Sequence, residues 1–130
     1  MSFVKEKAEN INLGIDNMID AMKKDYKDWS SQGFGRGMPE INKKMVDEYN
    51  NSFDISFGSK YVKIKSNRSC TAFIVNTDKD KKFKKGDILK PAGYKAPTRN
   101  KARGNVLEGD YPIRWTGPLY LDPENEQFFG

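Results

Sequence analysis

The sequence predicts an α+β protein in which a long N-terminal helix and a short second helix precede a curved antiparallel β-sheet. Three observations support this fold class: helical apolar spacing before residue 50, alternation of apolar and polar residues after residue 53, and turn residues between the alternating segments. Helices grouped before strands are typical of α+β folds. The 130 residues fit a single domain, 1–130, with a helical region 1–50, a basic β-rich region 53–121 and an acidic tail 122–130.

The first expected element is a helix over residues 3–30, with Ser2 as its N-cap. Apolar residues recur there every three or four positions, as an amphipathic helix requires. The members of this apolar stripe are Val4, Ala8, Ile11, Ile15, Met18, Met22 and Trp29. The stripe predicts packing against the chain's own sheet. Because it spans about four heptads, the alternative is a homo-oligomer formed through the helix of residues 4–29.

A glycine-rich segment, residues 32–37, separates the first helix from a shorter second one. The segment lacks the Gly-Lys-Ser/Thr ending of a phosphate-binding loop and follows no expected strand, so we interpret it as a connection between helices. Pro39 suits the first position of the second helix. Ile41, Met45 and Tyr49 then define the face that we expect this helix to bury.

The second half of the chain is expected to form strands joined by short turns. Two segments alternate in polarity, and a third is an apolar run that is typical of a central, buried strand. A fourth, very short segment follows a kink at Gly86 and Asp87. The expected strands are residues 53–57, 60–65, 70–75, 88–89 and 113–116.

The absence of histidine and the presence of one cysteine restrict the chemistry of the chain. Histidine is the commonest general base and metal ligand, and Ser-His and Cys-His nucleophiles require it. Cys70 lies in the apolar run, where a structural thiol is expected. Asp78 and Asp80 lack the remaining ligands of a calcium loop. We therefore expect a non-enzymatic protein without a metal or cofactor.

A cytoplasmic location is expected for this chain. No apolar run reaches the ~18–20 residues of a membrane span, so no membrane partner is predicted. The N-terminus also lacks the charged and apolar regions of a signal peptide. A single cysteine agrees with a reducing compartment.

Positive charge is concentrated in one third of the chain. Residues 60–103 contain 14 Lys or Arg and 3 Asp or Glu, a net charge of +11, whereas the whole chain carries +5. Such asymmetry predicts an acidic partner such as a nucleic acid or a nucleotide. The alternative is a lysine-rich surface that serves solubility alone.

A candidate binding surface lies near the end of this basic region. Residues 90–97 contain two prolines and a glycine, which predicts an ordered loop. Arg99, Lys101 and Arg103 then recur every second residue and would point the same way in an extended segment. Aromatic residues beside such cations are typical of sites that stack nucleobases. The candidate residues are Lys84, Lys85, Lys90, Tyr94, Lys95, Arg99, Lys101, Arg103, Asn105 and Trp115.

Motifs within residues 60–120 resemble a family of small uncharacterised proteins encoded by tailed bacteriophages. These motifs are FKKGDILKPA at 83–92, AP at 96–97, NKARGN at 100–105 and WTGP at 115–118. Residues 69–73 are similar to a strand that often reads Ser-Val-His-x-Phe in that family. Thr71 stands at the position of its histidine, so no role of that histidine carries over. The resemblance implies a phage origin and no particular activity.

The sequence as a whole predicts a small phage-encoded binding protein, located in the cytoplasm of an infected bacterium, whose basic surface holds nucleic acid or another polyanion. An alternative hypothesis is a host-takeover or counter-defence factor that binds a host protein or sequesters a nucleotide signal. A third hypothesis is an enzyme acting on nucleic acid through Lys, Tyr and carboxylate groups. Its best candidates would be Glu108 and Asp110, although two carboxylates flanking Gly109 are more typical of a tight turn.

Overall fold

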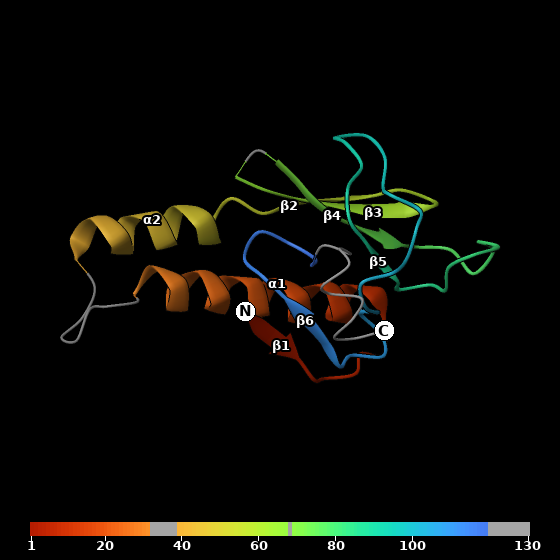
Figure 1. The fold of residues 1–130 in the computed structure, drawn as a ribbon, viewed down its shortest axis with the longest axis horizontal. Helices are drawn as coiled ribbons and strands as arrows, with labels where there is room; N and C mark the ends of the chain where they lie inside the picture. Colours follow the sequence, from red (N-terminus) through yellow and green to blue (C-terminus); the bar gives the residue numbers. More distant parts are fainter. Residues whose placement is uncertain (32–38, 68, 120–130) are drawn as a thin grey trace.

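The computed structural model describes residues 1–31, 39–67 and 69–119. Within these residues lie two helices and two antiparallel sheets, so the predicted α+β class is confirmed (Figure 1). The elements, in chain order, are β1 (Ser2–Val4), α1 (Ile11–Ser30), α2 (Glu40–Asn50), β2 (Asp54–Phe57), β3 (Tyr61–Ser66), β4 (Ser69–Val75), β5 (Ile88–Leu89) and β6 (Tyr111–Ile113). The predicted glycine-rich connection at 32–37 and the acidic tail at 122–130 lie outside the described residues.

Helix α1 begins later than the sequence predicted. Asn10 is its N-cap, and the Asn10 side chain accepts a hydrogen bond from the Leu13 backbone N–H at 2.9 Å. The expected cap at Ser2 is therefore wrong, because Ser2 belongs to β1. β1 pairs with β6, which lies at the other end of the described chain, and no local pattern marks that pairing.

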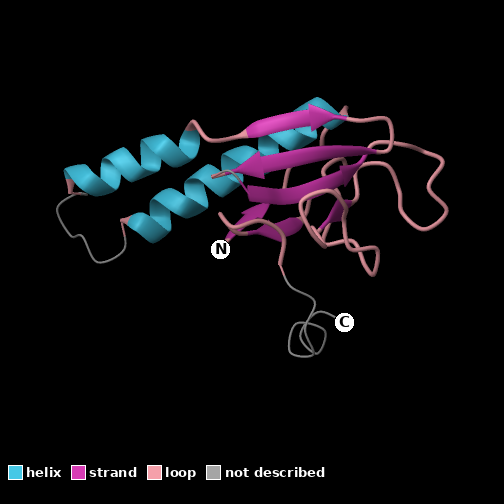
Figure 2. Ribbon diagram, turned by 90° about the horizontal axis from the view of Figure 1, so that it is seen from above, coloured by secondary structure: helices cyan, strands magenta, loops and turns pink. Residues whose placement is uncertain are grey.

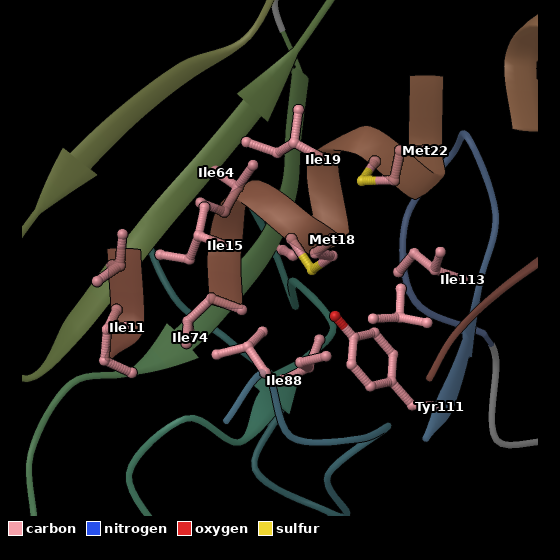
Figure 3. Close-up of a cluster of buried hydrophobic side chains, with 14 residues drawn as sticks. Ile11, Ile15, Met18, Ile19, Met22, Ile64, Ile74, Ile88, Tyr111 and Ile113 are labelled. Carbon is pink, nitrogen blue, oxygen red and sulfur yellow. The ribbon is translucent and has the colours of Figure 1, made fainter. Parts of the chain in front are cut away.

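Helix α1 runs between the four-stranded sheet and the two-stranded β1–β6 ribbon (Figure 1). Its side chains meet Ile64 and Ile74 on one side and Tyr111 and Ile113 on the other (Figure 3). From Ile11 onward the predicted apolar stripe is thus buried within this chain as far as Met22, while Trp29 is 54% exposed. One helix therefore supplies the apolar contact surface for both sheets.

The four-stranded sheet has the order β2-β3-β4-β5, and all neighbours are antiparallel. β4 occupies a central position and is largely buried, as predicted. β3 alternates as predicted, with Val62 and Ile64 buried while Lys63 and Lys65 lie on the outer face. The expected last strand is shifted toward the N-terminus, and as β6 it pairs with β1 instead of joining a single curved sheet.

Helix α2 lies antiparallel to α1, and both helices extend past one end of the sheet (Figure 2). It buries Val46 and Tyr49, whereas Ile41 is 70% exposed and Met45 is 43% exposed. The predicted buried face is therefore correct only at Tyr49. Pro39 is the N-cap and precedes the first helical residue. A short helix that packs along a single neighbour buries a narrow strip, and sequence spacing alone did not identify it.

Candidate nucleic-acid interface

The loop of residues 90–97 is closed by its own backbone and turns over the outer face of the sheet (Figure 1). The Thr98 N–H donates to the Lys90 carbonyl oxygen at 2.7 Å, and the Thr98 hydroxyl donates to the same oxygen at 2.7 Å. A backbone bridge between Pro91 and Pro97 narrows the base of the loop. These contacts explain why a segment rich in proline and glycine is ordered and able to position Tyr94.

Two lysines of β3 hold the Tyr94 ring against the sheet. The Lys63 Nζ lies 3.4 Å from the centroid of the ring. The Lys65 Nζ donates to the Tyr94 hydroxyl at 3.1 Å and lies 3.1 Å from Asp54 Oδ2. Hydrogen bonds to Tyr94 and then to Asp54 raise the pKa of Lys65. We call Tyr94, Lys63 and Lys65 the Tyr94 platform.

The Tyr94 platform is accessible to a ligand because Tyr94 remains 52% exposed. Its position combines an aromatic ring with two ammonium groups from a neighbouring strand. Such a combination can stack a planar group on the ring and pair with an anion beside it. Tyr94 was predicted as a site residue, whereas Lys63 and Lys65 were not, although their alternation in residues 60–65 was the signal that placed both on one face.

Three of the predicted cations, Lys84, Lys90 and Arg103, contact groups of the same chain. Lys84 Nζ lies 2.6 Å from Glu108 Oε1, and the hydrogen bond to Glu108 raises the pKa of Lys84. Arg103 Nε donates to the Leu119 carbonyl oxygen at 3.3 Å. Lys90 Nζ donates to the Pro118 carbonyl oxygen at 3.0 Å. Burial, followed by repulsion from nearby cationic side chains, lowers the pKa of Lys90.

Arg99 points toward the β4–β5 loop. One of its Nη atoms lies 2.9 Å from Asp80 Oδ1, and the other donates to the Tyr61 hydroxyl. The hydrogen bond from Arg99 is the main cause that holds the pKa of Asp80 well below its ordinary value. Arg99 and Arg103 therefore bind different parts of the chain. The segment of residues 99–103 is not an extended strand that would point its cations the same way, as the sequence had predicted.

The remaining predicted lysines lie at separate places. Lys95 is exposed next to Tyr94, and Lys101 is exposed on the following segment. Lys85 is half-buried and lines a hollow together with Asn10 at the start of α1. Lys95 is therefore the predicted lysine that sits beside the platform, while Lys85 lies near the helix.

Asn105 has a structural role. Its Nδ2 donates to Asp87 Oδ1 at 2.9 Å and to the Lys85 carbonyl oxygen at 3.0 Å. Its Oδ1 accepts the backbone N–H groups of Leu107 and Glu108 at 2.8 and 3.1 Å. These four bonds use the hydrogen-bonding capacity of a buried amide, which leaves little for an anion.

The two motifs KGDIL and ARGN lie side by side along the edge of β5. The Ile88 N–H donates to the Gly104 carbonyl oxygen at 2.8 Å, and the Arg103 N–H donates to the Ile88 carbonyl oxygen at 2.8 Å. The Val106 N–H donates to the Gly86 carbonyl oxygen at 2.9 Å. Gly86 has φ +93°, which favours glycine, and a Cβ there would lie 2.7 Å from Asn105 Oδ1. The motifs thus encode a backbone pairing that covers this edge of the sheet.

Trp115 belongs to an aromatic cluster at the helices. Its ring centroid lies 4.9 Å from Tyr26, 5.3 Å from Trp29 and 6.0 Å from Tyr49. Its backbone N–H donates to Asp25 Oδ2 at 2.8 Å. Trp115 is therefore held against α1 and α2, while Tyr94 lies on the outer face of the sheet.

The groups considered for catalysis have structural surroundings. Burial raises the pKa of the Cys70 thiol and so disfavours the reactive thiolate. Gly109 and Asp110 have φ values of +71° and +62°, in agreement with the predicted turn. Within the described ranges, no group of three potential metal ligands comes together. No helix among the same residues is both long and apolar enough to cross a bilayer.

These features define a basic α+β protein with open antiparallel sheets and a partly exposed tyrosine on the outer face of the larger sheet. The chain belongs to a family of unknown function (DUF7717), and the match spans residues 2–117. The family therefore includes the helices as well as the region around residues 60–120 that carries the sequence motifs. No curated protein and no solved structure matches the chain.

Proposed function

We propose that this protein binds nucleic acid without catalysis and that the Tyr94 platform is its contact surface. The observation that supports this most strongly is the partly exposed Tyr94 ring, held by Lys63 at 3.4 Å and by Lys65 at 3.1 Å. Aromatic rings that stack bases beside lysines that contact phosphates are the recurrent elements of nucleic-acid interfaces.

The charge of the surrounding segment supports the same proposal. Residues 60–103 carry a net charge of +11, and the exposed Lys95 and Lys101 lie on the segments that flank or follow Tyr94. A field of this sign attracts a polyanion before contact and raises its rate of association. The resemblance of the motifs to phage proteins adds that the nucleic acid would be met in the cytoplasm of an infected bacterium.

Single-stranded nucleic acid fits the platform better than a duplex. A base can stack on one tyrosine ring only when the ring can reach the base's face, and in a duplex that face is covered by the neighbouring base pairs. The loop presents a single aromatic ring on a strand face, with no described helix beside it that would enter a major groove (Figure 2). We therefore expect binding to single strands with little preference for sequence.

Fluorescence anisotropy with a labelled single-stranded oligonucleotide tests the proposal at roughly 50 mM and 200 mM salt. Tyr94→Ala should weaken binding by about 1–3 kcal/mol, or roughly 5- to 150-fold, because it removes one stacking contact. Lys63→Gln should weaken binding and reduce the salt dependence by about one phosphate contact. Lys44→Gln, on the exposed side of α2, is the matched control that removes one charge elsewhere.

Two results would contradict the proposal: affinity that does not fall as salt rises, or equal affinity for the wild-type and Tyr94→Ala proteins. The alternative hypothesis, a host-takeover or counter-defence factor that binds a host protein or sequesters a nucleotide signal, predicts no measurable binding of the oligonucleotide even at the lower salt concentration. The same titration therefore separates the two hypotheses.

A further inference from the structure

A basic hollow lies between the β2–β3 turn and the β4–β5 loop. Both segments are at the end of the sheet opposite α2 (Figure 1). The volume of the hollow is about 630 Å³. The residues that line it are Ser59, Lys60, Thr77, Lys79, Asp80, Lys81 and Arg99. None of these residues belongs to the Tyr94 platform, and three of the four cations were not selected from the sequence.

The charges around the hollow are strongly unbalanced. Four of its seven lining residues are Lys or Arg, and one is acidic. Asp80 Oδ1 already accepts hydrogen bonds from the Arg99 guanidinium at 2.9 Å and from the backbone N–H groups of Lys82 and Phe83 at 2.9 and 3.0 Å. The lysines therefore face a site in which Asp80, the acidic residue among the described lining, is committed to the loop itself, and this creates a positive potential inside the hollow.

The walls of the hollow are tied to one another. Asn76 joins the two loops, because its Nδ2 donates to the Gly58 carbonyl oxygen at 2.9 Å and its backbone N–H donates to the Lys60 carbonyl oxygen at 2.9 Å. Lys82 Nζ donates to the Arg99 carbonyl oxygen at 2.6 Å. The Lys79 N–H donates to the Thr77 hydroxyl at 3.1 Å. An open hollow whose loops are held by hydrogen bonds loses less conformational entropy when a ligand binds than a mobile surface does.

We infer that this hollow is a binding site for a compact phosphate-bearing anion. Its volume lies in the range of small-molecule sites. Arg99 supplies a guanidinium group fixed by Asp80, the lysines supply ammonium groups, and Ser59 supplies a hydroxyl donor, which together suit the oxygens of a phosphoryl group. The inference goes beyond the proposed function, because a small anion can bind here without stacking on Tyr94.

The phosphoryl group has two possible sources: a free nucleotide or the terminal phosphate of a nucleic acid strand. Isothermal titration calorimetry at roughly 50 mM salt, with pyrophosphate and then ATP, examines the first source directly. The second source is examined by comparing an oligonucleotide that carries a 5′-phosphate with the same oligonucleotide that ends in a hydroxyl. Binding of pyrophosphate or ATP, or tighter binding of the oligonucleotide that carries the 5′-phosphate, supports the inference and identifies the source of the phosphoryl group.

The double variant Lys79→Gln/Lys81→Gln removes two exposed cations from the hollow and retains the contacts that hold Asp80 and Arg99. Its affinity for the preferred phosphate should fall at least about tenfold, because charge-assisted hydrogen bonds are lost. Lys43→Gln/Lys44→Gln on α2 is the matched control with the same change in net charge, and its affinity should stay close to that of the wild type.

The inference is overturned if none of these phosphates binds the wild-type protein, or if the Lys79→Gln/Lys81→Gln protein binds as tightly as the wild type. Tyr94→Ala separates this result from the proposed function. Pyrophosphate binding should survive in Tyr94→Ala even though binding of the hydroxyl-ended oligonucleotide weakens. Loss of pyrophosphate binding in a folded Tyr94→Ala protein would contradict a separate site.

Discussion

Asp80 organises a stretch of chain that is otherwise almost entirely basic. Its Oδ1 accepts hydrogen bonds from Arg99 and from the backbone N–H groups of Lys82 and Phe83. Arg99 makes the largest contribution to holding the pKa of Asp80 below its ordinary value of 3.8. The folded loop therefore prefers the ionised carboxylate, and this single side chain connects the order of the loop to pH.

Replacement of Asp80 should have an effect that depends on pH. The pKa of Asp80 is lower in the folded state than in the unfolded state. The contribution of Asp80 to stability is therefore present above about pH 4 and is lost as the pH falls toward the pKa of the folded state. Asp80→Asn should thus be less stable than the wild type in urea at pH 7, and the difference should shrink below pH 4. Asp78→Asn, in the same loop, is the control. A difference that stays constant with pH would rule out this role.

The Tyr94 platform shows which part of the candidate site could be predicted from the sequence. Proline and glycine around Tyr94 predicted an ordered loop, because these residues exclude helix and central strand. The polarity pattern also placed Lys63 and Lys65 on one face of a strand. Their contact with Tyr94 depends on how the loop folds over the sheet, and no spacing in the sequence encodes such a contact between distant segments.

At the scale of the secondary-structure elements, the sequence predicted β2, β3 and β4 well because their residues alternate or form a continuous apolar run. β1 was missed because Val4, its last residue, continues the apolar spacing of α1 toward the N-terminus. The pairing of β1 with β6 satisfies the backbone hydrogen bonds that a helix would otherwise satisfy. A tertiary contact therefore overrode a local pattern at the N-terminus.

The packing of α1 against the segment after Asn105 depends on Gly14. A Cβ at Gly14 would lie 2.6 Å from the Val106 carbonyl oxygen and 2.9 Å from the Val106 Cβ. Next to this contact between Gly14 and Val106, the Ala8 N–H donates a hydrogen bond to the Leu107 carbonyl oxygen at 3.0 Å. Helix and loop thus meet backbone to backbone, at a distance that a larger residue would prevent.

Gly14→Ala should therefore destabilise the protein even though alanine favours a helix by about 1 kcal/mol over glycine. We expect a net loss of about 1–3 kcal/mol, because the clash is with backbone and a buried side chain that can move little. Urea unfolding measures this difference in free energy. Gly93→Ala is the matched control, since a Cβ there meets no atom within 4 Å. Stabilisation by Gly14→Ala would show that the loop moves away from the helix at little cost.

At the scale of the whole molecule, the segment that carries the net positive charge supplies strands of the core as well as basic loops. Helix α1 contributes the apolar side chains that join both sheets, whereas residues 60–103 carry the net charge of +11. The loop of residues 90–97 lies on the face of the four-stranded sheet away from α1, and the β4–β5 loop lies at one end of that sheet (Figure 1). This arrangement lets a polyanion approach without disturbing the core.

The burial of the apolar stripe of α1 predicts how the whole molecule unfolds. Met18 is fully buried in the cluster that contains side chains from both sheets, so Met18→Ala should cost about 2–5 kcal/mol. Leu13→Ala, on the exposed side of the same helix, should have a much smaller effect.

Because this core lies within one chain, the thermal midpoint should not change between roughly 5 and 100 µM protein. A midpoint that rises with concentration would instead support the oligomer that the stripe suggested.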